Sequence, residues 1–465
     1  AGLAGWKGAA VKLGWSGAAM TATATVLVAA LTATAHAETA APTLAPNLPS
    51  ATDIRVLPPL DPVATNAPTA AGLQAALAPA LGSRTLGSTQ RLVVFDALSG
   101  DQLYGQDEST PATPASTNKL LTAGAVLAGY GADQQISTKV VQAANPNELV
   151  LVGAGDPLLK VSGTTDGERR VASLSTLARR TASAVKSANP PISGPVTLSY
   201  DDTLFTGPTM SPTWPKTYST AGVVAPVTAL MADGGRIGGV VNQNPSQATA
   251  ARFASLLTSR GVQVSGSPAA ATAPPDANQV AEVSSAPMSQ LVTHTLTESD
   301  NEAAEVLGHL AGVRLGGSGS FEGGAQAVNK MLTDLGIDTA GVTIHDGSGL
   351  SRDDAVPART LGQLLSAAAR NASPRLWPLA YGMPIAGFTG TLATRYGTPA
   401  TKPGRGVVRA KTGTLTGVSA LAGLVTDADG SLLAFALMSP DVASADSAAA
   451  VWDGASATLA KCGCK

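Results

Sequence analysis

Ser116 and Lys119 form a pair whose residue types and spacing could perform covalent chemistry. Pro114 precedes them, and an apolar run that includes Leu120 and Leu127 follows, which is typical of the start of a helix. Residues three positions apart share one face of a helix, so the serine hydroxyl and the lysine amine can meet. A serine becomes a nucleophile when a base takes its proton, and a lysine is such a base when burial or a nearby cation lowers its pKa. The alternative interpretation is a helix N-cap followed by a surface lysine.

Two later stretches favour the chemical interpretation. Ser299-Asp300-Asn301 precedes the helical pattern of 302–307, and Lys411-Thr412-Gly413-Thr414 lies inside a strand-like run. Taken alone, each stretch could be a cap, a turn or the end of a strand. In this order, however, Ser-x-x-Lys, Ser-Asp-Asn and Lys-Thr-Gly are the signature of serine penicillin-binding proteins and β-lactamases.

The elements that must position these motifs have local patterns of their own. Ser99-Gly100-Asp101 and Asp427-Ala428-Asp429-Gly430 predict two hairpin turns. The surrounding patterns predict strands at 91–96, 102–106, 406–412, 418–425 and 432–438, and helices at 287–298 and 448–461. The long segment between the Ser116 helix and Ser299 has strand patterns at 148–153 and 196–201 and a helical pattern at 174–185. This segment is therefore expected to be an inserted, smaller α+β domain.

The composition is that of a globular protein, with 44% hydrophobic and 13% charged residues in 465. The net charge of −2 gives no reason to expect a nucleic acid or another polyanion as partner. No metal-ligand spacing accompanies the histidines or the cysteines, so neither a metal nor an organic cofactor is expected. The four histidines are dispersed at His36, His294, His309 and His345.

The two cysteines, Cys462 and Cys464, lie at the C-terminal end of the sequence. They could close a small loop with each other, bridge two chains, or stay reduced. The absence of cysteine from the remaining sequence is typical of an exported protein.

The first 70 residues divide into two segments with different patterns. In residues 1–37, Lys7 and Lys12 precede an apolar run, and Ala35-His36-Ala37 is a small-x-small cleavage pattern. A cleaved signal is favoured over a retained anchor, which would associate the protein with the membrane, because threonines make the run a marginal span. Residues 38–70 are rich in Pro, Ala and Thr, as expected of an extended linker. We therefore expect an extracytoplasmic protein of the cell envelope, either secreted or anchored to the outer face of the cytoplasmic membrane.

The chain resembles one branch of the penicillin-binding proteins closely. This branch is the low-molecular-mass class C proteins, the D-alanyl-D-alanine carboxypeptidase/endopeptidase family. Besides the three motifs, the stretches at 151–157, 346–352 and 390–392 carry the resemblance, which spans about residues 71–460. It implies an α+β fold of the penicillin-binding/β-lactamase type, with an antiparallel sheet flanked by helices and a helical part. Residues 71–136 and 280–465 would form the catalytic domain and 137–279 the inserted one, which is too short for the further domain of longer members.

The resemblance also implies roles for the motif residues. Ser116 would be the acylated nucleophile and Lys119 its base, with the charge of Lys411 helping to lower the pKa of Lys119. Ser299 and Asn301 would relay protons and hold Lys119 and the substrate amide. The remaining motif positions would bind substrate. Thr412 and Thr414, on either side of Gly413, would bind its terminal carboxylate, and the backbone N–H groups of Ser116 and Thr414 would form the oxyanion hole.

A side pocket reads the diamino-acid arm of the peptidoglycan stem in some relatives. The resemblance places its residues at Asp201, for the amine, and Arg352, for the carboxylate, with Leu415 and Thr416 alongside. Leu415 stands where a relative has methionine. The alternative interpretation of Asp201 is a turn residue at the end of a strand.

These expectations combine into one functional hypothesis. It is an exported serine D,D-carboxypeptidase, with D,D-endopeptidase action as a further option, that cleaves D-Ala-D-Ala bonds of peptidoglycan stem peptides through an acyl-serine. β-Lactam antibiotics would be covalent inhibitors. The two alternatives are a serine β-lactamase, which shares the three motifs, and a non-catalytic protein that binds the cell wall.

Overall fold

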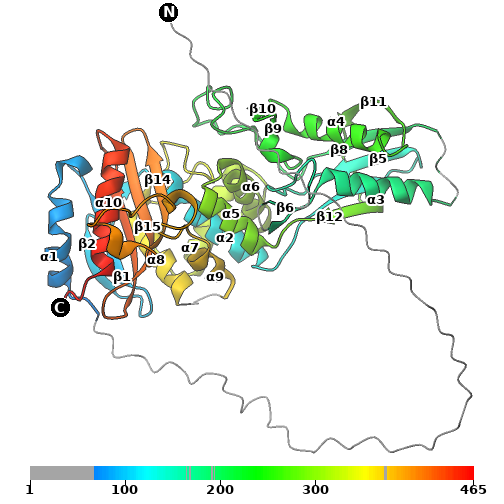
Figure 1. Cartoon of the computed structure of the whole chain (residues 1–465). Helices are drawn as coiled ribbons and strands as arrows, with labels where there is room; N and C mark the ends of the chain where they lie inside the picture. Colours follow the sequence, from blue (N-terminus) through cyan, green and yellow to red (C-terminus); the bar gives the residue numbers. More distant parts are fainter. Residues whose placement is uncertain (1–66, 164, 167–168, 190–191, 193, 371–373) are drawn as a thin grey trace, which may run out of the picture. The chain divides into compact units, whose positions relative to one another are not determined.

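The computed structural model describes residues 67–465 except 164, 167–168, 190–191, 193 and 371–373 (Figure 1). The predicted export segment, 1–37, and residues 38–66 of the predicted linker lie outside the described residues. None of the helices in the described part of the chain is both long and apolar enough to cross a membrane.

An antiparallel sheet forms one part of the fold (Figure 1). Its strands alternate between two cores, because successive residues of a strand point to opposite faces. Leu92 and Val94 join one core, and Val93 and Phe95 join the other. The strand order is β14 (Arg409–Leu415), β15 (Val418–Thr426), β16 (Leu432–Ser439), β1 (Arg91–Asp96) and β2 (Gln102–Gln106).

Helices cover both faces of this sheet (Figure 1). On one face, α1 (Ala70–Leu81) and α10 (Ala445–Ala460) contribute Leu73 and Trp452 to the core that contains Leu92. On the other face, α8 (Ala358–Ala369) contributes Leu361 to a core that continues into the helical part. That part comprises α2 (Lys119–Tyr130), α5 (Met288–Glu298), α6 (Asn301–Ala311), α7 (Phe321–Asp334) and α9 (Trp377–Tyr381). The predicted fold class, an α+β penicillin-binding fold with helices flanking an antiparallel sheet, is confirmed.

A second sheet is formed by the segment predicted to be inserted and the residues that directly follow it. It is mixed, since β8 pairs in parallel with β5 and β11, whereas β4 pairs antiparallel with β5 and β12. The helices α3 (Leu174–Lys186) and α4 (Pro245–Thr258) pack on it through Leu177 and Phe253. The strand order is β11 (Val264–Ala270), β8 (Val196–Asp201), β5 (Glu148–Val152), β4 (Ser137–Gln142) and β12 (Asn278–Ser284). The predicted boundary after residue 279 therefore divides a single strand, β12.

Short elements connect these parts. The pairing of β3 (Pro111–Ala112) with β13 (Val356–Pro357) brings the chain before Ser116 next to the chain after residue 352. The other short strands are β6 (Thr165–Asp166), β7 (Arg169–Arg170), β9 (Arg236–Ile237) and β10 (Val240–Val241). The short helical turns are η1 (Arg84–Leu86), η2 (Ala115–Asn118), η3 (Asp233–Gly235), the π-helical η4 (Gly312–Gly316), η5 (Pro374–Leu376), η6 (Gly390–Leu392) and η7 (Lys402–Gly404).

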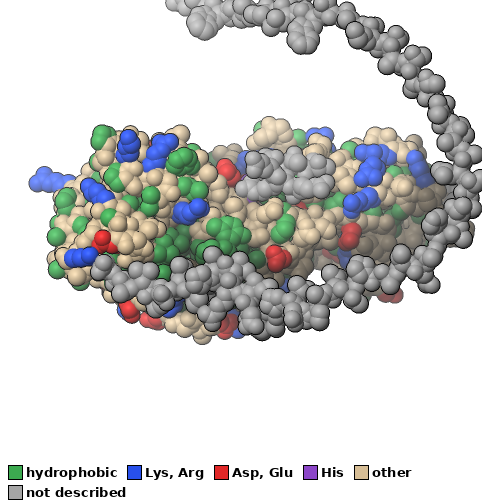
Figure 2. Space-filling model, turned by 60° about the horizontal axis from the view of Figure 1, so that its bottom comes forward, with side chains coloured by type: hydrophobic (Ala, Val, Ile, Leu, Met, Phe, Trp, Pro, Cys, Tyr) green, Lys and Arg blue, Asp and Glu red, His purple; other side chains and the backbone are tan. Residues whose placement is uncertain are grey.

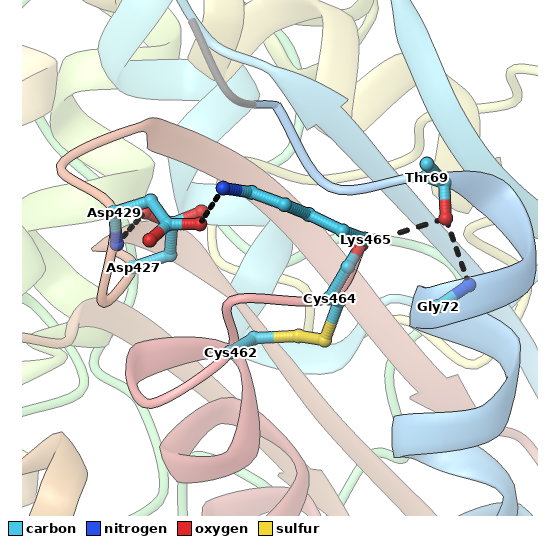
Figure 3. The surroundings of a disulfide bond; sticks show 7 residues. All are labelled: Thr69, Gly72, Asp427, Asp429, Cys462, Cys464 and Lys465. Carbon is cyan, nitrogen blue, oxygen red and sulfur yellow. Dashed lines mark hydrogen bonds and ion pairs between the residues drawn. A yellow bond between two sulfur atoms is a disulfide. The ribbon is translucent and has the colours of Figure 1, made fainter.

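A disulfide joins Cys462 and Cys464, so of the three options for these cysteines the structure has the small intrachain loop (Figure 3). The carbonyl oxygen of Cys464 accepts a hydrogen bond of 2.7 Å from the backbone N–H of Thr69, the N-cap of α1. Nζ of Lys465 lies 3.5 Å from Oδ2 of Asp429, in the turn between β15 and β16. The disulfide-closed C-terminal segment therefore contacts both the start of α1 and the turn between β15 and β16.

Both signs of charge occur on the face shown in Figure 2, and uncharged and apolar side chains cover most of that face. This agrees with the net charge of −2.

Candidate active site

Ser116 lies in η2, immediately before α2. The predicted helix therefore begins with a 3-10 turn, in which the Thr117 hydroxyl donates a 2.6 Å hydrogen bond to the carbonyl of Pro114. Gly413 of β14 packs directly on this turn, since a Cβ at that position would lie 2.6 Å from the Pro114 carbonyl oxygen. Only glycine permits this approach, which sets the Lys-Thr-Gly strand beside the serine.

The amine of Lys119 is fully buried and has three oxygen neighbours. Nζ lies 2.9 Å from Oγ of Ser116, 2.8 Å from Oδ1 of Asn301 and 2.8 Å from the carbonyl oxygen of Ser348. Burial lowers the pKa of Lys119 to about 8, although nearby carboxylates act in the opposite direction. These carboxylates belong to Glu305, Asp346, Asp300 and Glu302.

The Ser-Asp-Asn motif forms the junction between α5 and α6. Ser299 ends α5 in the left-handed region, with φ of 58°. Asp300 is the N-cap of α6, where its Oδ1 accepts from the N–H of Ala303, and its Oδ2 lies 3.0 Å from Nε2 of His294. Nδ2 of Asn301 donates to the carbonyl of Val223 at 3.3 Å, which turns the amide oxygen toward Lys119.

Lys411 approaches the same site from β14. Its Nζ is fully buried, 2.9 Å from Oγ of Ser299 and 2.9 Å from the carbonyl oxygen of Thr412. Burial lowers the pKa of Lys411 well below its usual value, and the charge of Lys119 adds to this shift. Burial is the leading cause of the lowered pKa for both amines, and the expected contribution of the Lys411 charge to the pKa of Lys119 stays a prediction.

Two buried carboxylates hold the glycine-containing loop at 346–351 beside Lys119. Asp346 accepts from the N–H groups of Gly349 and Ser351, both at 2.6 Å, and from Nε1 of Trp214. Glu305 accepts from the N–H groups of Gly347 and Ser348. Sequence reasoning gave neither carboxylate a role. Two signals were present: Asp346 begins the stretch 346–352 that carries the family resemblance, and Glu305 lies one helical turn after Asn301.

The structure brings together only part of the predicted side pocket. The guanidinium of Arg352 donates a 2.8 Å hydrogen bond to the carbonyl of Thr416, so these two residues and Leu415 lie together at the end of β14. The hydrogen-bond partners of Asp201 are different residues. It ends β8 in the second sheet, where its carboxylate accepts from the N–H and hydroxyl of Thr203 and from the N–H of Ala273. The structure favours the turn interpretation of Asp201.

The site uses oxygen and nitrogen groups without a metal-ligand cluster. In the described part of the chain, no group of three or more His, Cys, Asp or Glu side chains is placed to hold a metal ion. The neutral form of a buried lysine beside a serine hydroxyl can instead take the serine proton, as acyl transfer requires.

Comparison with known proteins identifies the family. The sequence matches the D-Ala-D-Ala carboxypeptidase 3 (S13) family over residues 73–242 and 237–460. The chain belongs to this family. The assignment confirms the resemblance on which the expected fold and activity were based.

Named relatives of this S13 chain cover most of its length. It is 38% identical over 405 residues to a carboxypeptidase from Mycobacterium tuberculosis, covering 85% of each chain. It is 36% identical over 452 residues to carboxypeptidase DacB from Mycolicibacterium smegmatis, covering 95% of each. The solved structure of penicillin-binding protein 4 from Haemophilus influenzae has a TM-score of 0.63 at 23% identity, covering 76% of this chain and 90% of that one. This structural similarity shows the fold.

Proposed function

We propose that this member of the S13 family is a serine D,D-carboxypeptidase that uses Ser116 as its nucleophile and Lys119 as the base. The observation that carries the proposal is the 2.9 Å separation between Nζ of Lys119 and Oγ of Ser116. With a pKa of about 8, about a tenth of this amine is neutral at pH 7, far more than for a lysine of ordinary pKa. A neutral amine has the lone pair that removes the hydroxyl proton.

The reaction then proceeds as two acyl transfers. Lys119 takes the proton of Ser116, and Oγ attacks the carbonyl carbon of the D-Ala-D-Ala bond. The carbon–nitrogen bond breaks, and the terminal D-alanine leaves after its amine receives a proton. Water next attacks the acyl-serine ester, which releases the shortened stem and returns the proton to Ser116. The Ser299–Lys411 contact of 2.9 Å offers a second route for proton transfer beside the leaving amine.

Substrate binding would use the strand that carries Lys411. Thr412 and Thr414 would bind the terminal carboxylate, and the backbone N–H groups of Ser116 and Thr414 would stabilise the oxyanion. Donors of this kind contribute about 2.7–4 kcal/mol each to the stability of a transition state. The close packing of Gly413 on the Ser116 turn supports this arrangement, since it brings β14 next to that turn.

Peptidoglycan stem peptides are the proposed substrate, and β-lactams the proposed covalent inhibitors. A relative from Actinomadura, 31% identical over 427 residues, is named a D-alanyl-D-alanine carboxypeptidase. Penicillin-binding protein 4 of Haemophilus influenzae has a structure in complex with a β-lactam. Both β-lactam and peptide present a carbonyl and a carboxylate to the same groups. A substrate in the wall requires the protein to act outside the cytoplasm, so we also propose export through residues 1–37, with membrane association if that segment is retained.

Endopeptidase action on cross-linked stems remains part of this proposal, because the scissile bonds are chemically alike. The family assignment favours a carboxypeptidase over the two alternatives, a β-lactamase and a non-catalytic wall-binding protein. The fate of the acyl-enzyme separates these functions.

Intact-protein mass after incubation with benzylpenicillin tests the proposal. We expect a stable adduct of one drug molecule on the wild-type chain and none on the Ser116→Ala variant, together with D-alanine release from a stem pentapeptide by the wild type alone. A mass that returns to that of the free protein while the drug is consumed would identify a β-lactamase. The absence of any adduct would support the binding protein.

A further inference from the structure

Glu305 is a fully buried carboxylate in α6 with two backbone partners. Its Oε2 accepts from the N–H of Gly347 at 2.9 Å, and its Oε1 accepts from the N–H of Ser348 at 2.8 Å. Both carboxylate oxygens therefore hold consecutive peptide units of the loop at 346–351. Hydrogen bonds to a charged acceptor are stronger than those between neutral groups.

This loop presents an oxygen to the base of the reaction. The carbonyl of Ser348, whose own N–H binds Glu305, accepts a 2.8 Å hydrogen bond from Nζ of Lys119. The other side of the loop is held by α2, where the Thr122 hydroxyl donates to the Gly347 carbonyl at 2.6 Å. The peptide unit of the Ser348 carbonyl is held by Asp346, which accepts from the Gly349 N–H, and Glu305 holds the peptide unit immediately before it.

One helix consequently determines two of the three contacts of the Lys119 amine. Asn301, the first residue of α6, contacts Nζ directly, and Glu305 lies one turn later on the same face. Any displacement of Glu305 moves the loop carbonyl relative to the amide of Asn301. Such a displacement would change how Nζ is aimed at Ser116.

We propose that Glu305 is a positioning residue for acylation: together with Asp346 it holds the loop whose Ser348 carbonyl contacts Lys119, and its carboxylate is one of the negative charges that act on that amine. The inference rests on the proposed role of Ser116 and Lys119. It extends that role to a carboxylate that meets neither the substrate nor the reacting atoms.

The charges around the two groups support this proposal. The Glu305 carboxylate raises the pKa of Lys119, together with Asp346, Asp300 and Glu302, while Lys411 faces Lys119 as a second amine. Burial, followed by the charge of Asp346, raises the pKa of Glu305, while hydrogen bonds from Ser348 and Gly347 act in the opposite direction and favour the charged form.

Glu305→Gln tests the proposal, because it keeps the shape of the side chain but loses the charge. Glutamine also offers an N–H₂ group to one of two backbone donors. We expect acylation by benzylpenicillin at saturating drug to slow on the order of 100-fold. The dissociation constant of the non-covalent complex should stay within about twofold of that of the wild type, because no substrate group is lost. The ascending limb of the acylation rate against pH should move to lower pH, by less than about one unit.

Two further variants make the result decisive. Glu305→Asp keeps the charge but shortens the reach, so we expect slow acylation with the limb at the wild-type pH. Glu322→Gln makes the same exchange at an exposed residue of α7. This variant should match the wild type in its acylation rate and in the pH range over which that rate rises. Wild-type acylation rates in the Glu305 variants would overturn the inference. A slower Glu305→Gln variant whose acylation rate rises over the same pH range as that of the wild type would also overturn it. If Glu305→Gln does not fold, wild-type acylation by Glu305→Asp overturns it. Failure of the wild type itself to form an adduct at Ser116 would instead refute the proposed function.

Discussion

Lys119 has to satisfy two opposing demands. Its amine must be buried enough to lose a proton, yet an unpaired charge in the interior is costly. The three oxygens around Nζ supply hydrogen-bond partners, while the fully buried position supplies the pKa of about 8. The carboxylates beyond them, led by Glu305, stop that pKa from falling further.

The rate of acylation should therefore depend on the protonation of Lys119. Only the neutral amine accepts the serine proton, so the rate should rise with pH and level off above about pH 8. Lys119→Arg replaces the amine with a group that stays charged in proteins. We expect this variant to acylate about 10²–10⁴-fold more slowly. Stopped-flow measurement with a chromogenic cephalosporin provides both observations.

Lys160→Arg is the matched control, because Lys160 lies outside the site, in the segment that follows β5. This variant should keep the wild-type rate and the wild-type dependence on pH. A Lys119→Arg variant that acylates at the wild-type rate would show that another group is the base.

The reactive residues could be predicted from sequence because each motif is local in the chain. Ser116 and Lys119 lie three residues apart, and Ser299 and Asn301 adjoin one helix start. Glu305 could not be predicted in the same way. Its role depends on a loop more than forty residues away in sequence, at Gly347 and Ser348. The partner of Asp201 was also hidden from sequence reasoning, because Ala273 is still farther along the chain, at a separation of 72 residues.

At the scale of elements, the site is formed where β14 meets η2. The residues of β14 alternate in direction, and Gly413 is the one that faces the turn before Ser116. A side chain there would meet the Pro114 carbonyl, the Thr117 methyl group and Ala420 of the neighbouring strand. The strand can approach the nucleophile only because this position has no side chain.

Gly413→Ala should therefore separate the strand from the Ser116 turn. Because a Cβ would lie 2.6 Å from the Pro114 carbonyl oxygen, the backbone has to shift by several tenths of an ångström or more. We expect the oxyanion donors to lose their spacing and the acylation rate to fall about 10²–10³-fold. The measurement is the acylation rate of the purified variant, with its melting temperature recorded alongside.

Gly454→Ala in α10 is the control for this exchange. No atom lies within 4 Å of a Cβ at Gly454, and glycine is unfavourable inside a helix. We expect this variant to gain about 0.4–1 kcal/mol in stability with unchanged acylation. Equal acylation by Gly413→Ala and the wild type would show that the strand tolerates a side chain at the turn.

Sequence patterns predicted the strands of the first sheet better than their ends. The predicted strand at 406–412 begins three residues later, at Arg409, and continues to Leu415. The turn η7 and the residues that follow it occupy 402–408, so the pattern alone could not distinguish turn from strand there. The paired antiparallel strands β15 and β16 were easier, since a hairpin turn at 427–430 fixes their register.

At the scale of the whole molecule, the segment that carries the second sheet contacts α6, the helix that begins at Asn301. Residues between β8 and α4 contact the start of α6, where the Val223 carbonyl accepts from Asn301 and the Ala225 N–H donates to Glu302. Arg236 reinforces this contact. Its guanidinium donates to the carboxylate of Glu302 and to the carbonyl of Gly222. The segment far from the motifs in sequence thus orients the amide that touches Lys119.

Arg236→Ala should loosen this connection without touching a reacting group. The loop at 222–225 would lose a partner, and the Asn301 amide would be less firmly directed at Lys119. Residues that act through such networks change coupling by about 0.5–2 kcal/mol, so we expect acylation to slow about 2- to 30-fold. Arg252→Ala, at an exposed position of α4 in the same segment, is the matched control and should acylate at the wild-type rate. If both variants match the wild type, the second-sheet segment does not orient Asn301. If only Arg236→Ala slows, the segment contributes to the active site through α6.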